Sequence, residues 1–504
     1  MPKSKTLLKE AKGKKKARRS EPESADEYLA EGVELEEAGE KWRGGDAVKA
    51  MRFFMRAIEM YDTGLKRHPT SFDLAYNKAR VQYEITQHPK LASQLPAPMI
   101  EILHIALRSH RDALDLQQDS PDILFNTAQV LTSLAEVLTE GKRPSEARIQ
   151  EAVKYLHEAL DLFQRCLALQ ELRYTESQEQ IKMIEFSAFE EQQAPPPVEQ
   201  PSQSEGRASP TQSEQWATVI EPVTKNALVD TAVAQLEALA TLCALLTSDS
   251  GSSLAWIEEY SSDLQEKIAS YADGTDRQHD LTLARAKFIS SMAEVSYRGG
   301  RIDAETYKNE LNRAFNDIDL SQDPAGLCSK GEALVSFNLA VADTYIIKDQ
   351  DGLNRSLNLR WQSLSTALDC LSAASKIAST DNLPKIHIAR GDVELYRWRL
   401  GRVPWNYAMA SNNASILINN AQTYYRGGAA FARRDGWAED EREGSIKEAL
   451  AKALSGDVAR IQELMASARE EVMRIAEDMV EDGLVAGEDM EKMFSAAEPD
   501  VIVF

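Results

Sequence analysis

The chain has 504 residues, of which 43% are hydrophobic, and a formal net charge of −22. This length and apolar content allow a sizeable core in more than one lobe, and the lack of an uninterrupted apolar run of about 18 residues predicts that no segment spans a membrane. Its four cysteines stand singly, without the Cys-x-x-Cys spacing of zinc sites, so we expect buried thiols in a reducing compartment and neither disulfides nor bound zinc.

The charge is unevenly distributed along the chain. Residues 1–19 contain nine Lys and Arg and one Glu, whereas the remainder contains 49 basic and 79 acidic residues. We expect so acidic a body to repel nucleic acid over most of its surface and to attract basic proteins. Acidity that serves solubility alone is the plain alternative.

Residues 1–24 are polar, charged and without periodicity, and they predict a disordered tail. A basic run within this tail is typical of a nuclear-localisation signal or of a segment that binds a polyanion such as RNA. A merely solvating tail is the alternative. The residues that would carry the targeting role are Lys12, Lys14, Lys15, Lys16, Arg18 and Arg19.

From residue 25 onward, apolar residues recur at three- and four-residue spacing, which predicts helices. This pattern covers residues 25–186 and stops at a Pro-, Gln- and Ser-rich stretch over 187–215, which predicts a disordered linker. It resumes over 216–494 and is followed by a short tail at 495–504. The sequence lacks runs of β-branched residues in strict alternation, so we expect an all-α protein in two helical lobes.

The tripeptide Arg-Gly-Gly occurs three times, each time after an Ala and an aromatic residue at fixed distances. The three copies span Ala38 to Gly45, Ala293 to Gly300 and Ala421 to Gly428. RNA-binding boxes of this type cluster in low-complexity chain, whereas these copies lie far apart and each follows a helical pattern. Because Gly gives the backbone the freedom to end a helix, we predict that all three are turns between helices, with RNA contact as the alternative.

Small residues recur where two antiparallel helices would cross. Ala38, Ala50 and Ala57 have the spacing that such a crossing needs, and the aromatic Phe54 falls between the last two. In this spacing the chain resembles the tetratricopeptide repeat family, whose two-helix unit of about 34 residues carries small residues and an aromatic at corresponding positions. The resemblance implies a solenoid of helical hairpins that binds a protein along a groove lined by the first helix of each pair.

The resemblance also suggests which residues would contact a partner. In members of the family that hold the C-terminal carboxylates of heat-shock chaperones, a Lys and an Asn on one helix and an Asn in the next repeat form a clamp. Here Asn77 matches the last of these, but Leu35 and Gly39 occupy the first two positions. We therefore expect no partner of that kind and interpret Asn77 as a structural residue that binds neighbouring backbone. The candidate partner-binding residues are Asn77, Tyr83, Glu84, Arg390, Glu394 and Arg397. Which helix faces form the groove is left open by the sequence.

Signatures of catalysis are missing from the sequence. It contains no phosphate-binding glycine loop, no zinc-binding His-Glu-x-x-His and no Gly-x-Ser-x-Gly. His104 and His110 are six residues apart and do not share a helix face well enough to bind a metal together. We expect no catalytic, cofactor-binding or metal-binding residues, and therefore no enzyme.

The last long helical pattern carries one apolar stripe opposite an acidic face, which suits a polar cap that closes a solenoid. The stripe consists of Ile461, Leu464, Met465, Ala468, Val472, Ile475 and Met479.

These observations favour a non-enzymatic protein-binding scaffold in the nucleus and cytoplasm. Its acidic body and helical repeats are similar, in fold and charge, to assembly chaperones built from tetratricopeptide arrays. We therefore expect a chaperone or escort for a basic client, such as a ribosomal protein during ribosome biogenesis or a histone. The alternative is an adaptor subunit of a larger nuclear or translation-related complex, in which residues 1–19 contact RNA weakly.

Overall fold

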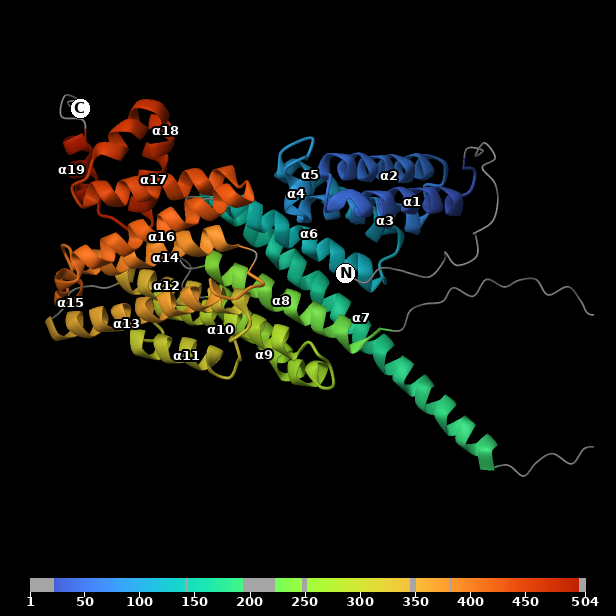
Figure 1. Ribbon diagram of the computed structural model, residues 1–504. Coiled ribbons are helices and arrows are strands. Elements are labelled where there is room, and N and C mark those ends of the chain that lie inside the picture. Colours follow the sequence, from blue (N-terminus) through green and yellow to red (C-terminus); the bar gives the residue numbers. More distant parts are fainter. Residues whose placement is uncertain are drawn as a thin grey trace, which may run out of the picture. The chain divides into compact units, whose positions relative to one another are not determined.

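The computed structural model describes residues 22–140, 144–193, 223–246, 252–344, 350–380 and 382–497. Within these residues it contains helices and no strands, which confirms the expected all-α class (Figure 1). The helices are α1 (Ala25–Arg43), α2 (Ala47–Arg67), α3 (Phe72–Gln87), α4 (Pro89–Ala92), α5 (Met99–Leu116), α6 (Pro121–Thr139), α7 (Glu146–Gln193), α8 (Lys225–Leu245), α9 (Ser252–Ala272), α10 (Gln278–Arg298), α11 (Ala304–Asn316), α12 (Pro324–Thr344), α13 (Gln350–Ala374), α14 (Leu383–Leu400), α15 (Ala408–Asn412), α16 (Ala414–Asp435), α17 (Ala438–Leu454), α18 (Ala459–Glu481) and α19 (Gly487–Ala497).

Short polar side chains begin several of these helices. The Ser24 hydroxyl accepts a hydrogen bond from the Glu27 backbone N–H, and the Glu27 side chain reaches back to the backbone of Ser24. The carboxylates of Asp46 and Asp303 accept from backbone N–H groups in the first turns of α2 and α11. Each contact satisfies a donor that the helix itself leaves unpaired, so the local sequence determines where these helices start.

Successive helices pack against each other in chain order. In the N-terminal part, α1 packs on α2, α2 on α3 and α3 on α5, and further along the chain the same order runs through α10 to α14, α16 and α17 to α19. Contacts between neighbours in sequence are the mark of a quasi-one-dimensional stack. The fold is therefore a solenoid of helical hairpins.

The chain divides into two compact units. Among the described residues, one unit consists of 22–138, 154–193, 223–235 and 268–275, and the other of 139–140, 144–153, 236–246, 252–267, 276–344, 350–380 and 382–497. This division differs from the lobes 25–186 and 216–494 expected from composition, because helices on both sides of the predicted linker pack together in the first unit.

The pairing of α7 with α8 shows this directly. α7 continues to Gln193, beyond the predicted end of the first lobe at residue 186. The Thr231 hydroxyl of α8 donates to Gln170 Oε1 of α7 at 2.8 Å. The rest of the predicted linker and most of both predicted tails lie outside the described residues.

The crossing of α1 and α2 uses small residues, with a shift of one position on α1. Ala50, Phe54 and Ala57 are completely buried, as the resemblance implied. On α1, however, Gly39 rather than Ala38 faces α2, since a Cβ on Gly39 would lie 3.0 Å from Phe54 Cζ. The helical rotation decides which of the two neighbours faces α2.

Two of the three Arg-Gly-Gly copies are turns, as predicted. Gly44 and Gly45 join α1 to α2, and Gly299 and Gly300 join α10 to α11, with Gly300 at φ +71°. The prediction is wrong for the third copy, which lies inside α16.

In the third copy, glycine serves close packing instead of a turn. A Cβ on Gly428 would lie 2.9 Å from Ile388 Cγ1 and 3.1 Å from the Pro384 carbonyl oxygen, both in α14. The backbones of α14 and α16 therefore approach so closely at this point that only glycine fits.

A buried tyrosine ring lies over a glycine in each unit. Tyr61 of α2 covers Gly32 of α1, where a Cβ would lie 2.1 Å from the ring, and Tyr425 of α16 covers Gly391 of α14, at 2.5 Å. The Tyr425 hydroxyl also donates to Asp392 Oδ1 at 2.7 Å. Each ring occupies the space that a larger side chain on the facing helix would need.

The predicted apolar stripe lies on α18, which is followed by one more helix, α19, and it packs into the core. A backbone kink at Ala468, with φ −147° and ψ 43°, divides α18 into two helical segments. Five members of the stripe are buried, namely Ile461, Met465, Val472, Ile475 and Met479. Both segments thus keep their apolar side inward.

Candidate protein-binding site

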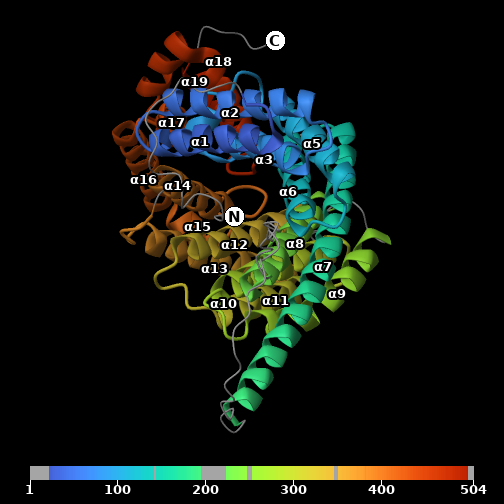
Figure 2. The same cartoon turned by 90° about the vertical axis from the view of Figure 1, so that its right-hand side faces the viewer.

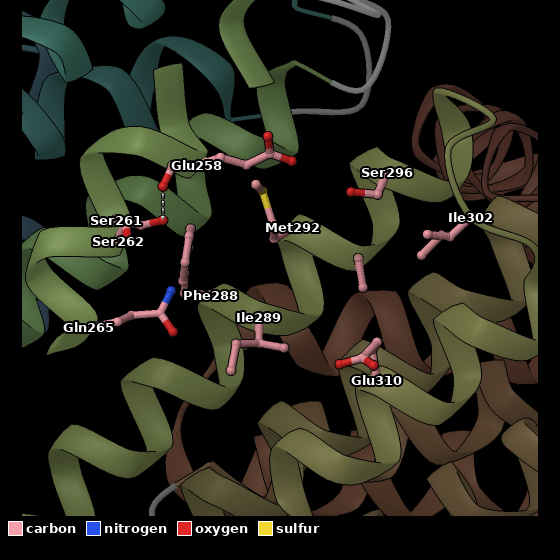
Figure 3. A pocket seen from close by; sticks show the side chains of 11 residues that line it. Glu258, Ser261, Ser262, Gln265, Phe288, Ile289, Met292, Ser296, Ile302 and Glu310 are labelled. Atoms are coloured by element: carbon pink, nitrogen blue, oxygen red, sulfur yellow. Dashed lines mark hydrogen bonds between the residues drawn. The ribbon is translucent and has the colours of Figure 1, made fainter. Parts of the chain in front are cut away.

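A groove of about 450 Å³ opens in the second unit between α9, α10 and α11 (Figure 3). Its floor is apolar and comes mainly from α10, with Phe288, Ile289, Met292 and Ala293, and its rim carries polar groups from the flanking helices, with Glu258, Gln265 and Glu310. The two carboxylates come from opposite sides of α10. The groove therefore combines apolar contact area with negative charge.

The second Arg-Gly-Gly turn positions the three helices around this groove. After Gly300 the chain reverses, so that α11 returns along α10 and Tyr297 stacks on Tyr307 with ring centroids 5.6 Å apart. Arg301 in the same turn binds Glu258 of α9 at 3.1 Å. The turn thus fixes α11 on one side of the groove, and the ion pair fixes α9 on the other side.

The side chains on the floor differ in how well they reach a ligand. Phe288 is 1% exposed and belongs to the core, whereas Ile289 and Met292 are half-buried and line the opening. An apolar side chain of a bound peptide can pack on Ile289 and Met292. Glu258 and Glu310 already pair with Arg301 at 3.1 Å and with Arg313 at 2.9 Å, so a cationic side chain of the peptide would share these carboxylates with the protein's own arginines. The helical spacing of Ile289 and Met292 is the same as that of core residues, so the sequence alone does not single them out as a site.

The three candidate residues of the first unit make contacts within the unit. Asn77 Nδ2 donates to the Asp73 carbonyl oxygen at 2.8 Å, which agrees with the structural interpretation of this residue. Tyr83 is 2% exposed, and its hydroxyl lies 3.0 Å from Ser133 Oγ. Glu84 belongs to an ion-pair network with Arg80 and Arg43. Packing and charge pairing within the unit account for all three.

The candidate residues of α14 lie on a helix that is enclosed by its neighbours. Glu394 is 1% exposed and accepts from Arg397 at 2.9 Å and from Asn420 at 2.8 Å. Arg397 also lies over the Trp361 ring, 4.3 Å from its centroid, and Arg390 lies over a neighbouring tyrosine. The structure thus joins Glu394 to Arg397 and leaves Arg390 in a separate aromatic contact.

A second buried charge cluster links α14 to α16 and α17. Lys447 is 5% exposed, and its ammonium lies 3.1 Å from both carboxylate oxygens of Asp392 and 2.9 Å from Glu443. Burial lowers the pKa of Lys447, but the two carboxylates outweigh it and hold the pKa above its usual value. Burial also raises the pKa of Asp392. Because the Tyr425 hydroxyl of α16 also donates to Asp392, the cluster links three helices at one point.

The acidic face of α18 remains partly open to solvent. Glu470 and Glu477 are exposed, whereas Glu471 pairs with Arg442 at 3.3 Å and Asp478 with Arg474 at 3.2 Å. Glu470 and Glu477 are therefore the stronger candidates for long-range attraction of a cationic partner.

The described residues offer few groups for covalent or metal chemistry. No group of three His, Cys, Asp or Glu side chains among them could hold a metal ion. Burial raises the pKa of the Cys166 and Cys243 thiols to about 12, which leaves almost no thiolate at neutral pH. Burial lowers the pKa of His110 to about 4, so this imidazole is neutral at pH 7.

Among the residues that the structure describes, one helix has the length and composition of a membrane span. In α8 an 18-residue window reaches a mean hydropathy of 1.5, and 61% of that window is buried within the protein. Asp230 and Glu237 interrupt its apolar residues, which is why no uninterrupted apolar run is present in the sequence. Burial of this extent is also what the core helix of a globular protein shows.

The arginines of the three Arg-Gly-Gly copies are engaged by carboxylates. Arg43 pairs with Glu40 at 2.9 Å, Arg298 with Glu294 at 2.9 Å and Arg426 with Glu448 at 2.8 Å. We expect that replacing the three arginines with Ala leaves RNA affinity unchanged, because these side chains already have anionic partners. Fluorescence anisotropy with a labelled single-stranded RNA measures this. A large loss of affinity in the triple variant would show instead that these arginines contact RNA.

The fold and the groove define the class: an all-α helical-repeat protein with a candidate peptide-binding cleft. No protein-family model matches the chain. The chain is similar to UPF0656 protein C926.02 of Schizosaccharomyces pombe, with 24% identity over 422 residues that cover 82% of this chain and 85% of the relative. Among solved structures it is similar to a circular tandem repeat protein with novel repeat topology and enhanced subunit contact surfaces, with a TM-score of 0.29 and 13% identity over 95% of this chain and 99% of that one.

Proposed function

We propose that this chain is a non-enzymatic scaffold of the tetratricopeptide repeat type that binds a basic protein and escorts it. The groove between α9, α10 and α11 carries the proposal, because it pairs an apolar floor with carboxylates at its rim (Figure 3). Such a groove suits a peptide segment that alternates apolar and cationic side chains. The burial of Ala50, Phe54 and Ala57 at the first helix crossing supports the repeat type.

The charge of the body supports a basic client. Outside residues 1–19, 79 acidic residues face 49 basic ones, so the field of the body attracts a cationic partner and shields it from nucleic acid. A ribosomal protein or a histone is the class of client that needs such shielding before delivery. We further propose that Lys12 to Arg19 direct the chain to the nucleus, where such clients are assembled.

A salt series on the purified full-length chain and its co-purified partner tests this function. We expect fast association at about 50 mM salt and a steep fall of the association rate towards about 500 mM, because exposed charges beyond the Debye length are screened. Reversing Glu470 and Glu477 to Lys should lower the association rate further. A flat association rate across the series would contradict charge shielding and favour the adaptor alternative.

A matched pair of variants tests the groove itself. Met292→Lys places a cation on the apolar floor and should weaken the complex about tenfold or more, as loss of a central contact does. Ser291→Lys adds the same charge at the next position of α10, outside the residues that line the groove, and should leave the affinity nearly unchanged. Equal affinities of the two variants would show that the client binds elsewhere.

A further inference from the structure

The second half of α7 carries a concentration of exposed apolar side chains. Among the described residues thirteen large hydrophobic side chains are exposed, and five of them belong to this one helix. Their exposed fractions are 56% for Leu172, 44% for Ile181, 63% for Met183, 69% for Ile184 and 63% for Phe186. At about 100° per residue, Met183 and Phe186 lie on one side of the helix and Ile181 and Ile184 on roughly the opposite side. Exposed apolar area of this density usually marks an interaction site.

Residues 166–173 of α7 anchor the helix in the first unit. Cys166 donates to the Pro121 carbonyl oxygen at 3.3 Å, Glu171 accepts from Tyr271, and Arg173 binds the Asp119 carbonyl oxygen at 2.6 Å. Beyond this anchored part, α7 extends past the other helices of its unit in both views (Figure 1, Figure 2). Four of the exposed apolar residues, Ile181, Met183, Ile184 and Phe186, therefore stand on an extension of a helix that is held at residues 166–173.

The negative charge of the second half of α7 indicates what kind of partner could bind there. From residue 171 to 191 the sequence contains six Glu against Arg173 and Lys182. A second copy of the same acidic segment or an anionic lipid surface would be repelled by it, whereas a cationic partner is attracted. The apolar side chains require that this partner also presents an apolar face.

We propose that residues 172–186 of α7 form a docking helix for a basic segment with an apolar face, on a protein partner. The segment and the groove of the second unit share no residue, so each can be disabled separately. The proposal depends on the proposed function only in the basic character of the partner.

The test uses the full-length chain and two synthetic peptides, an amphipathic helix of Leu and Lys and its counterpart of Leu and Glu. The variant Met183→Asp with Phe186→Asp removes apolar area from one side of the helix at two exposed positions, so the fold should persist. The matched control Thr175→Asp with Gln180→Asp adds the same charge at two exposed polar positions of the same helix. Fluorescence anisotropy measures the affinity, and circular dichroism checks that both variants keep the wild-type helix content.

We expect the Leu and Lys peptide to bind the wild type and the control alike, and the apolar variant about tenfold more weakly, as for removal of a hot-spot contact. The proposal would be overturned if the Leu and Glu peptide bound the wild type as tightly as the Leu and Lys peptide does. It would also be overturned if the apolar variant and the control bound the Leu and Lys peptide with equal affinity. A wild-type dimer in sedimentation velocity that the apolar variant abolishes would assign the segment to self-association instead. If Met292→Lys loses binding of the natural client and the α7 variant keeps it, the proposed function stands and this inference is overturned. If the α7 variant loses binding of the client and Met292→Lys keeps it, this inference stands and the groove is not the client's site.

Discussion

Replacing Lys447 with Met is expected to lower the free energy of unfolding of the second unit by about 3–5 kcal/mol. The ammonium is the common partner of Asp392 and Glu443, and its side chain is only 6% exposed. Without it, Asp392, whose side chain is 23% exposed, keeps a partly buried negative charge that still accepts from the Tyr425 hydroxyl at 2.7 Å. Urea denaturation of the full-length chain, followed by circular dichroism, measures the change.

Lys452→Met is the matched control on the same helix. Its ammonium pairs with Glu448 at 2.8 Å but is 28% exposed, so we expect a loss of less than about 1 kcal/mol. A double variant with Asp392→Asn and Lys447→Met should recover part of the loss, because no unpaired carboxylate remains at position 392. Equal losses in Lys447→Met and Lys452→Met would show that the buried cluster contributes no more than a surface pair.

The Lys447→Met loss should also depend on pH. Without the ammonium, the pKa of Asp392 in the folded state lies still further above its unfolded value of about 3.9. A carboxyl group whose folded pKa is raised adds stability as the pH falls, and that contribution is lost as the pH rises through the folded pKa. The difference in free energy of unfolding between Lys447→Met and the wild type should therefore become smaller as the pH is lowered from about 7 to about 5.

Gly428→Val is expected to destabilise the second unit by about 3 kcal/mol, near the upper end of overpacking effects. The new Cβ would meet Ile388 Cγ1 at 2.9 Å and the Pro384 carbonyl oxygen at 3.1 Å. The carbonyl belongs to the helix backbone and cannot rotate away, so α14 and α16 must separate. The midpoint of urea denaturation measures the effect.

Gly45→Val is the control at the same position of the first Arg-Gly-Gly copy. A Cβ on Gly45 has no atom within 4 Å, so we expect a change of less than about 1 kcal/mol from the turn backbone alone. If Gly45→Val proves as destabilising as Gly428→Val, the distinction between an open turn and a packed crossing is wrong.

Local features of the sequence were sufficient for the helical class and for several of its details. Helical periodicity and polar caps such as Ser24 depend on residues within a few positions of each other, so they can be recognised without the fold. The same holds for the turns at Gly44 and Gly300 and for the buried positions Ala50, Phe54 and Ala57. The apolar stripe of the last long helix belongs to this group as well.

Other features were decided only by contacts between residues far apart in the chain. Gly428 looks like Gly45 in sequence, yet it is packed against Pro384 and Ile388 of another helix. The boundary between the two units does not follow the Pro-rich stretch at 187–215, because α8 pairs with α7 across it.

The candidate site also depends on contacts between residues that are far apart in the chain. Met292 has the helical spacing of a core residue, and it lines a groove only because α9 and α11 leave it partly uncovered. The acidic composition indicates the charge of a partner from the sequence alone, since net charge does not depend on the fold. Where apolar area and carboxylates meet on the surface is a property of tertiary packing, because it depends on which helix faces are left without a neighbour.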